Sequence, residues 1–170
     1  MSKKSTHYKK GDWIVHTFYG VGEIIGVEKK IMGENTQKYY KVKTKNSIYF
    51  IPTDNVDNSR LRPISSQYML RKAINLIKDE PCELPSDHTQ RKRLISEKIN
   101  ESNLISTAAL IRDLWARRMI QKLNDHDENT VNKLIASFVK EWSITQKIRE
   151  EVAQEKFESL LKKTFSPKLF

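Results

Sequence analysis

Hydrophobic and polar positions follow two different periods along the chain. From residue 11 to 52, β-branched and aromatic residues occur in short runs separated by Gly, Asn and Lys, a pattern typical of strands and turns. From residue 65 onward, apolar residues recur at spacings of three and four, which indicates amphipathic helices. The chain is therefore predicted to be α+β, with one domain over residues 1–63 and a second over 64–170.

The first half contains four predicted strands: WIVH (13–16), GVGEIIGVEKKI (20–31), KYYKVKT (38–44) and SIYFIP (47–52). MGENTQ (32–37) is predicted as a hairpin loop, because Gly33 and Asn35 can take left-handed conformations at little cost. KTKNS (43–47) is predicted as a second turn. Pro52 is expected to end the last strand, because it lacks the N–H donor that a sheet needs.

Glycine supports this division of the chain. All five glycines lie in the first half, at Gly11, Gly20, Gly22, Gly26 and Gly33. Tight corners in a small, strongly curved sheet need this residue. We predict four or five antiparallel strands in a small Tudor- or SH3-like β-barrel, joined to the second domain by a short connection within residues 57–63.

The second half is predicted to be a compact bundle of about five helices, marked by Tyr68, Leu70, Ile74 and Ile77, by RKRLISEKI (91–99), by AALIRDLWARRMIQKL (108–123), by VNKLIASFVKEW (131–142) and by residues 144–165. Breaks and caps separate the helices: Pro81 and Pro85 after the first, Ser86 and Asp87 before the second, residues 100–103 after it, Ser106 and Thr107 at the start of the third, and Asn124, Asp125 and Asp127 as a polar turn before the fourth. Trp115 is expected in the core.

Charge adds a functional indication. The chain has 31 Lys and Arg against 21 Asp and Glu, a net charge of +10. Such an excess favours contact with phosphates, although a solvated basic face is the alternative. Both halves are basic, so charge alone does not locate a contact. Arg91, Lys92 and Arg93 stand out because they open a predicted helix, where backbone amides also favour phosphate.

The sequence offers no recognisable catalytic or metal-binding set. Cys82 is the single cysteine, so the chain alone forms neither a disulfide nor a thiolate zinc site. The four histidines show no metal-ligand spacing, and no glycine-rich phosphate loop is present. We expect no enzyme, metal or cofactor, and a small nuclease is an alternative without support. No apolar run matches a signal peptide or a membrane span, so a cytoplasmic protein is expected.

Three segments resemble the CarD/CdnL family of bacterial transcription regulators. GDWIVHTFYGVGEIIGVE (11–28) resembles the family's RNA-polymerase-interacting barrel, which the transcription-repair coupling factor shares. LIRDLWARR (110–118) resembles the family's helical signature, and RKRLISEKI (91–99) resembles its DNA-facing helix. The resemblance covers nearly all of residues 8–140. It implies a Tudor-like domain that binds the RNA polymerase β subunit, and a helical domain at the upstream edge of the melted promoter, where family members stabilise open complexes.

The resemblance also implies contact residues. The polymerase contacts it implies are Lys30, Tyr49, Phe50 and Pro52. The DNA contacts it implies are His88, Arg91, Lys92 and Arg93. The sequence departs from the family pattern at three positions. Phe50 stands where relatives can carry arginine, His88 replaces a wedge tryptophan with a ring of smaller apolar area, and Glu128 replaces a basic residue and would repel phosphate.

Two functions remain open from the sequence. The first is a transcription regulator that binds RNA polymerase and makes largely backbone contacts to promoter DNA, and is nucleoid-associated through the polymerase. The second is a polymerase-bound protein–protein interaction module without a DNA role, which His88 and Glu128 favour. Neither involves a membrane or a small-molecule substrate.

Overall fold

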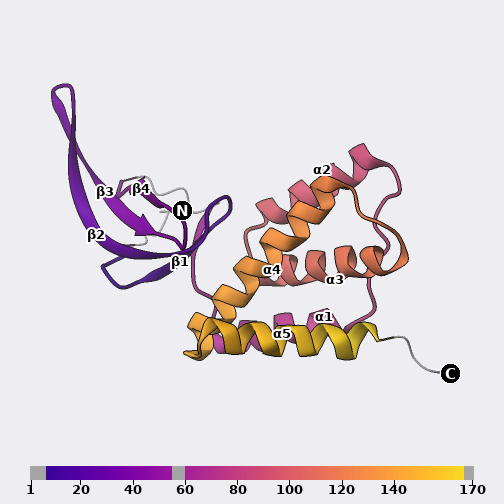
Figure 1. Ribbon diagram of the computed structural model, residues 1–170. Helices are drawn as coiled ribbons and strands as arrows, with labels where there is room; N and C mark the ends of the chain where they lie inside the picture. Colours follow the sequence, from indigo (N-terminus) through magenta and orange to yellow (C-terminus); the bar gives the residue numbers. More distant parts are fainter. Residues whose placement is uncertain (1–6, 55–59, 167–170) are drawn as a thin grey trace, which may run out of the picture. The chain divides into compact units, whose positions relative to one another are not determined.

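The chain divides into two compact units, Met1–Ile64 and Ser65–Phe170. The computed structural model describes residues 7–54 and 60–166, and in them the first unit carries all the strands and the second all the helices (Figure 1). The predicted α+β architecture is confirmed. We refer to the β unit and the helical unit, and describe each by itself. Within the described ranges, every helix is too short or too polar to cross a membrane.

The β unit is a single antiparallel sheet of β1 (Trp13–His16), β2 (Gly20–Met32), β3 (Asn35–Lys43), β4 (Ile48–Pro52) and β5 (Leu61–Pro63). The strand order is β4-β3-β2-β1-β5. The long strand β2 pairs with β1 at its start and with β3 over the rest, and a bulge between Ile24 and Gly26 bends it. Strands β4 and β5 are the edges, so no hydrogen-bonded ladder closes the barrel-like sheet in the described residues.

Two predictions about this unit are corrected. The expected loop over 32–37 is shorter, because β2 continues to Met32 and β3 begins at Asn35. The turn is Gly33–Glu34, and Gly33 has φ +65° at the position where type II′ turns favour glycine. Part of the expected linker 57–63 is strand β5, because Leu61 is buried in the core of the sheet. Residues 57–59 of that prediction lie outside the described residues.

The core of the β unit is small and lies on one face of the sheet, where it contains Tyr8, Ile14, Ile24, Tyr40, Val42 and Leu61, with Tyr49 and Ile51 packed against it. Gly22 on β2 lies close to the neighbouring strand β3, where there is no room for a side chain. A Cβ added at Gly22 would lie 2.7 Å from Val42 Cγ1, closer than real side-chain carbons come. Close packing therefore explains glycine at this position.

The helical unit contains α1 (Gln67–Lys78), α2 (His88–Asn100), α3 (Leu104–Ile120), α4 (Asp125–Gln146) and α5 (Glu150–Phe165). Most of these helices start at a capping residue, whose side chain accepts a hydrogen bond from an amide of the first turn. Asp87 accepts a hydrogen bond from the Gln90 amide, as expected for the start of α2. Helix α3 begins two residues earlier than predicted, because Asn103 caps it through the Ser106 amide. The predicted break at 100–103 agrees with the end of α2.

The polar turn expected at residues 124–127 is the beginning of α4. Asn124 caps α4 by accepting from the Asp127 amide, so Asp125 and Asp127 belong to the first helical turn. Carboxylates are stabilised there by the positive end of the helix dipole. Helix α4 ends where Lys147 takes a left-handed conformation, and α5 follows.

Two apolar clusters hold the helices together. The larger one joins α1, α3, α4 and α5 around Phe138 and Phe157. The smaller one packs α2 onto α3 and α4, with Ile95 and Leu114 at its centre. Tyr68, used to mark the first helix, is 58% exposed and lies outside both. Helix α2 packs only against the smaller of the two clusters. We therefore expect polar contacts to help fix its position.

Candidate functional site

Lys30 and Phe50 meet on the face of the sheet that points away from the β-unit core. Side chains alternate along a strand, and the neighbours of Phe50 in β4, Tyr49 and Ile51, pack against the core. The Lys30 ammonium lies 3.4 Å from the centre of the Phe50 ring and 5.6 Å from that of Tyr39. This cation–π arrangement holds a positive charge beside two half-buried rings.

Pro52 completes this surface, because it lies opposite Tyr39 in the β3–β4 register. We call Lys30, Tyr39, Phe50 and Pro52 the lysine–aromatic face. On the same side of the sheet, Lys41 Nζ pairs with Glu28 Oε1 at 2.9 Å. Carboxylate pairing therefore neutralises Lys41, while Lys30 has aromatic neighbours.

Tyr49 does not belong to the lysine–aromatic face. Its ring stacks on Tyr19 at 4.4 Å between centroids, and its buried hydroxyl has no hydrogen-bond partner in the described residues. Burial raises the pKa of the Tyr49 hydroxyl well above its usual value, and Tyr19 raises that pKa further. The four polymerase contacts implied by the resemblance therefore divide between the two sides of the sheet.

The β1–β2 turn adds an aromatic cluster that sequence reasoning missed. His16 Nδ1 accepts hydrogen bonds from the amides of Phe18 and Tyr19, and the imidazole lies 4.7 Å from the Tyr19 ring. Phe18 is 66% exposed and its ring lies 5.2 Å from the Arg60 guanidinium. In the sequence, the run HTFYG (16–20) carries Phe18 and Tyr19 directly before Gly20. Two adjacent aromatic residues in a turn were the sign of an exposed surface.

Lys92 and Arg93 lie exposed near the start of α2, as does His88. Arg93 pairs with Glu97 one turn later at 3.0 Å, and both side chains are largely in water. Such a pair is weak and easily exchanged for another anion. Three of the four expected DNA contacts therefore lie on an accessible surface.

Arg91, the fourth, is a correction, because it is buried. Its Nε donates to Asp127 Oδ2 at 2.6 Å, and one terminal nitrogen donates to the carbonyls of Pro85 and Ser86, each at 2.9 Å. The side chains of Arg91 and Asp127 are 6% and 1% exposed. Arg91 thus connects the start of α2 to the start of α4, and these internal contacts occupy its guanidinium.

Glu128 lies beside this junction and pairs with Arg118 Nη2 at 3.0 Å. His88 of α2 and His126 of α4 also approach, with ring centroids 6.3 Å apart. The carboxylate that departs from the family pattern therefore has a structural partner on α3. It reduces the positive charge near the start of α2.

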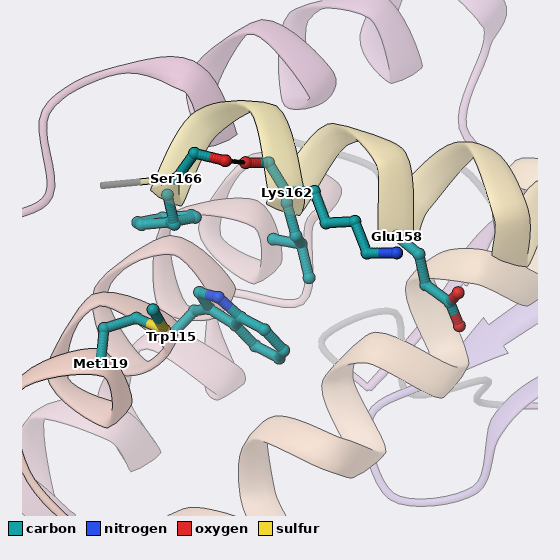
Figure 2. Close-up of a pocket in the computed structure, with 7 residues that line it drawn as sticks. Trp115, Met119, Glu158, Lys162 and Ser166 are labelled. Atoms are coloured by element: carbon teal, nitrogen blue, oxygen red, sulfur yellow. Dashed lines mark hydrogen bonds between the residues drawn. The ribbon is translucent and has the colours of Figure 1, made fainter. Parts of the chain in front are cut away.

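Helices α3 and α5 form an apolar groove with a volume of about 470 Å³. Figure 2 shows Trp115 and Met119 on one side, and Glu158 and Lys162 on the other. Trp115 packs partly against the larger helical core and its ring lies 5.0 Å from the Arg118 guanidinium. Trp115, predicted to be in the core, is therefore partly buried: it packs against the core and also lines the groove.

The described residues contain no group of three or more His, Cys, Asp and Glu side chains able to hold a metal ion. Cys82 is exposed, and its Sγ accepts a hydrogen bond from Arg112 at 3.4 Å. The accessible surfaces described above present charges and aromatic rings, which suit binding.

Comparison with known proteins agrees with both units. Residues 8–65 match the CarD-like/TRCF RID domain, and residues 72–158 match the CarD C-terminal domain. A curated Bacillus subtilis protein, named "Putative transcription factor YdeB", is 23% identical over 146 residues, which is 85% of this chain and 95% of that protein. Two matches in the family's own order cover most of the chain. The chain therefore belongs to the CarD-like family, as its sequence motifs predicted.

Proposed function

We propose that this protein regulates transcription by binding the RNA polymerase β subunit through its lysine–aromatic face and promoter DNA through the exposed start of α2. Membership of the CarD-like family implies transcription regulation through interaction with RNA polymerase, and the family is not one of enzymes. The subunit contacted, the DNA contact and the effect on open-complex stability are the proposal.

The observation that carries the polymerase contact is the position of Lys30 over Phe50 in the domain that matches the polymerase-interacting family. An accessible aromatic ring suits the centre of a protein interface, where aromatic residues contribute much of the binding energy, and the cation beside it can attract an acidic partner surface. The family resemblance implies that relatives can carry arginine at this position. Here Lys30 returns a positive charge to the same place.

The DNA contact is assigned to Lys92 and Arg93, with His88 beside them. Both cations are exposed within the first two turns of α2, so they can reach phosphate oxygens without breaking a buried interaction. Arg91 supports this surface indirectly by fixing the start of α2 to α4. We expect the contact to lack base specificity.

The polymerase contact is tested by titrating the full chain with purified polymerase core enzyme. Phe50→Ala should weaken binding about tenfold, as expected for an interface hot spot. Lys10→Ala, which removes an exposed lysine before the first strand, is the matched control. Failure of the wild-type chain to bind core enzyme would show that the polymerase proposal is wrong.

The DNA contact is tested by measuring open-complex lifetime on a ribosomal-type promoter. A regulator that contacts the promoter should change the lifetime, and Lys92→Gln with Arg93→Gln should reduce that change. The alternative is a polymerase-bound interaction module, which the pairing of Glu128 with Arg118 favours. An unchanged effect in the double variant, with polymerase binding retained, would support this alternative.

A further inference from the structure

The β2–β3 hairpin continues beyond the rest of the sheet as a two-stranded ribbon (Figure 1). Strand β1 pairs with β2 only as far as Glu23, and β4 pairs with β3 only from Tyr39 onward. Residues 27–38, which we call the hairpin arm, therefore lie beyond both neighbouring strands. Between Lys29 and Lys38 the strand ladder joins β2 and β3 only to each other, and Thr53 donates hydrogen bonds to the Lys38 carbonyl at the base of the arm.

Alternation along the strands gives the hairpin arm two different faces. Lys30 belongs to the lysine–aromatic face. Val27, Lys29 and Ile31 point to the opposite side, together with Lys38 and Thr36, the cross-strand partners of Lys29 and Ile31. We call these five residues the arm face. Val27 is 51% exposed and Ile31 is 79% exposed, and both lysines are exposed as well.

The two lysines of the arm face lie directly opposite each other in the register. Like charges in this position repel and destabilise a strand pair. Neither Lys29 nor Lys38 forms an ion pair within the described residues, in contrast to Lys41, which is paired with Glu28. An anionic partner would relieve this repulsion, and it would also cover the exposed aliphatic side chains.

We propose that the arm face is a second DNA-binding surface, in which Lys29 and Lys38 contact phosphates of duplex DNA and Val27 and Ile31 pack against the sugars between them. A two-stranded ribbon has the dimensions of a DNA groove, and alternating basic and apolar residues match a backbone of alternating phosphate and sugar. This contact is separate from that of α2. It also leaves the lysine–aromatic face free.

Glu34 limits which part of the hairpin arm can contact DNA. It is exposed in the turn at the end of the arm, and would repel phosphate there. The lysines, which lie back from the turn, therefore make the phosphate contacts. Removing the Glu34 charge should strengthen DNA binding.

The test is fluorescence anisotropy of a labelled DNA duplex with the full chain over a range of salt concentrations. DNA affinity falls as salt rises, so a plot of log affinity against log salt has a negative slope. The double variant Lys29→Gln/Lys38→Gln should make that slope shallower by about 1.8, the value for two phosphate contacts. Lys9→Gln with Lys10→Gln makes the same charge change at two exposed lysines outside the sheet, and should leave the slope nearly unchanged. Because the arm variant removes a repulsive pair, its Tm should not fall.

Two single variants separate the parts of the contact. Ile31→Ser should weaken DNA binding several-fold without changing the salt slope, because it removes apolar area and no charge. Glu34→Gln should strengthen binding. Both results would support the arm face as a DNA contact.

Other outcomes would overturn it. If the Lys29/Lys38 variant binds DNA with the wild-type slope but loses affinity for polymerase core enzyme, the arm face contacts protein and the DNA proposal is wrong. If only Lys92→Gln with Arg93→Gln lowers the slope, the α2 contact stands and the arm contact is rejected. A lowered slope in the arm variant alone supports the arm and rejects the α2 contact, so the two proposals fail separately.

Discussion

Arginines of the helical unit and lysines of the hairpin arm have different neighbours. Arg91, Arg112 and Arg118 each pair with a carboxylate, at Asp127, Asp113 and Glu128 respectively. Lys29 and Lys38 face each other across the ribbon without a carboxylate partner in the described residues, and Lys30 lies over aromatic rings. Positive charge thus serves internal pairing at these three arginines and an accessible surface at these lysines. The partners of each cation, rather than the net charge of a domain, indicate where an anion can bind.

The largest effect should come from breaking the buried pair. Arg91→Met leaves the Asp127 carboxylate buried without its partner, and should lower the free energy of unfolding by about 3–5 kcal/mol. Arg93→Met, which removes the exposed pair with Glu97, should lower it by less than about 1 kcal/mol. Urea unfolding followed by circular dichroism measures both. Equal small losses would mean that Arg91 does not hold α2 in place.

The β unit has no comparable buried ion pair in its described residues, and we expect it to depend on close packing. Gly22→Ala places a Cβ against Val42 and should destabilise the protein by about 1–3 kcal/mol. Gly26→Ala is the control in the same strand, because an added Cβ there has nothing within 4 Å. Val42→Ala alone should also destabilise, because Val42 is buried in the core, but the two substitutions together should cost less than the sum of their single losses in thermal unfolding. Fully additive losses would indicate a backbone effect instead.

A third prediction tests whether the ion pair between Glu128 and Arg118 limits DNA binding by the helical unit. Glu128→Lys removes the partner of Arg118 and adds a cation, so DNA affinity should rise and the salt slope should steepen by about one to two. Glu151→Lys makes the same change in the first turn of α5 and is the control. Anisotropy titrations measure both variants. Equal increases would mean that total charge matters and its position does not.

The smallest effect concerns an exposed carboxylate between α2 and α3. The hydrogen bond from Ser106 and the nearby Lys98 lower the pKa of Glu101. A lowered pKa in the folded state stabilises the protein above the usual carboxyl range, and this contribution is lost as pH falls through the folded pKa. Ser106→Ala should therefore cost a few tenths of a kcal/mol near pH 7, and the difference should shrink on acidification. Urea unfolding at pH 7 and at pH 3 measures it. Ser96→Ala, at an exposed position on α2, should show no such pH dependence.

Much of the fold follows from local patterns. Strand runs, glycine positions and apolar spacing predicted the α+β division and the helices because each reports local backbone preference or one buried face. Errors of a few residues at the starts of α3 and α4 arose where two polar residues compete as caps. Asn103 rather than Ser106 caps α3.

Arg91 shows where the site prediction failed and what could have corrected it. Arg91 and Ile95 are four residues apart and share the buried face of α2, whereas Lys92 and Arg93 point elsewhere. Helical periodicity therefore separated the buried arginine from its exposed neighbours. The meeting of Lys30 with Phe50 had no such indication, because it depends on the β2–β3–β4 register and on a bulge.

The pair between Arg91 and Asp127 has a consequence for synthesis of the protein, because its partners are 36 residues apart in the chain. While a ribosome has made α2 but not yet the first turn of α4, Arg91 has no carboxylate to accept its hydrogen bond. We expect α2 to remain undocked until that turn emerges. The exposed basic start of α2 would then take its final position late, after most of the chain has been translated.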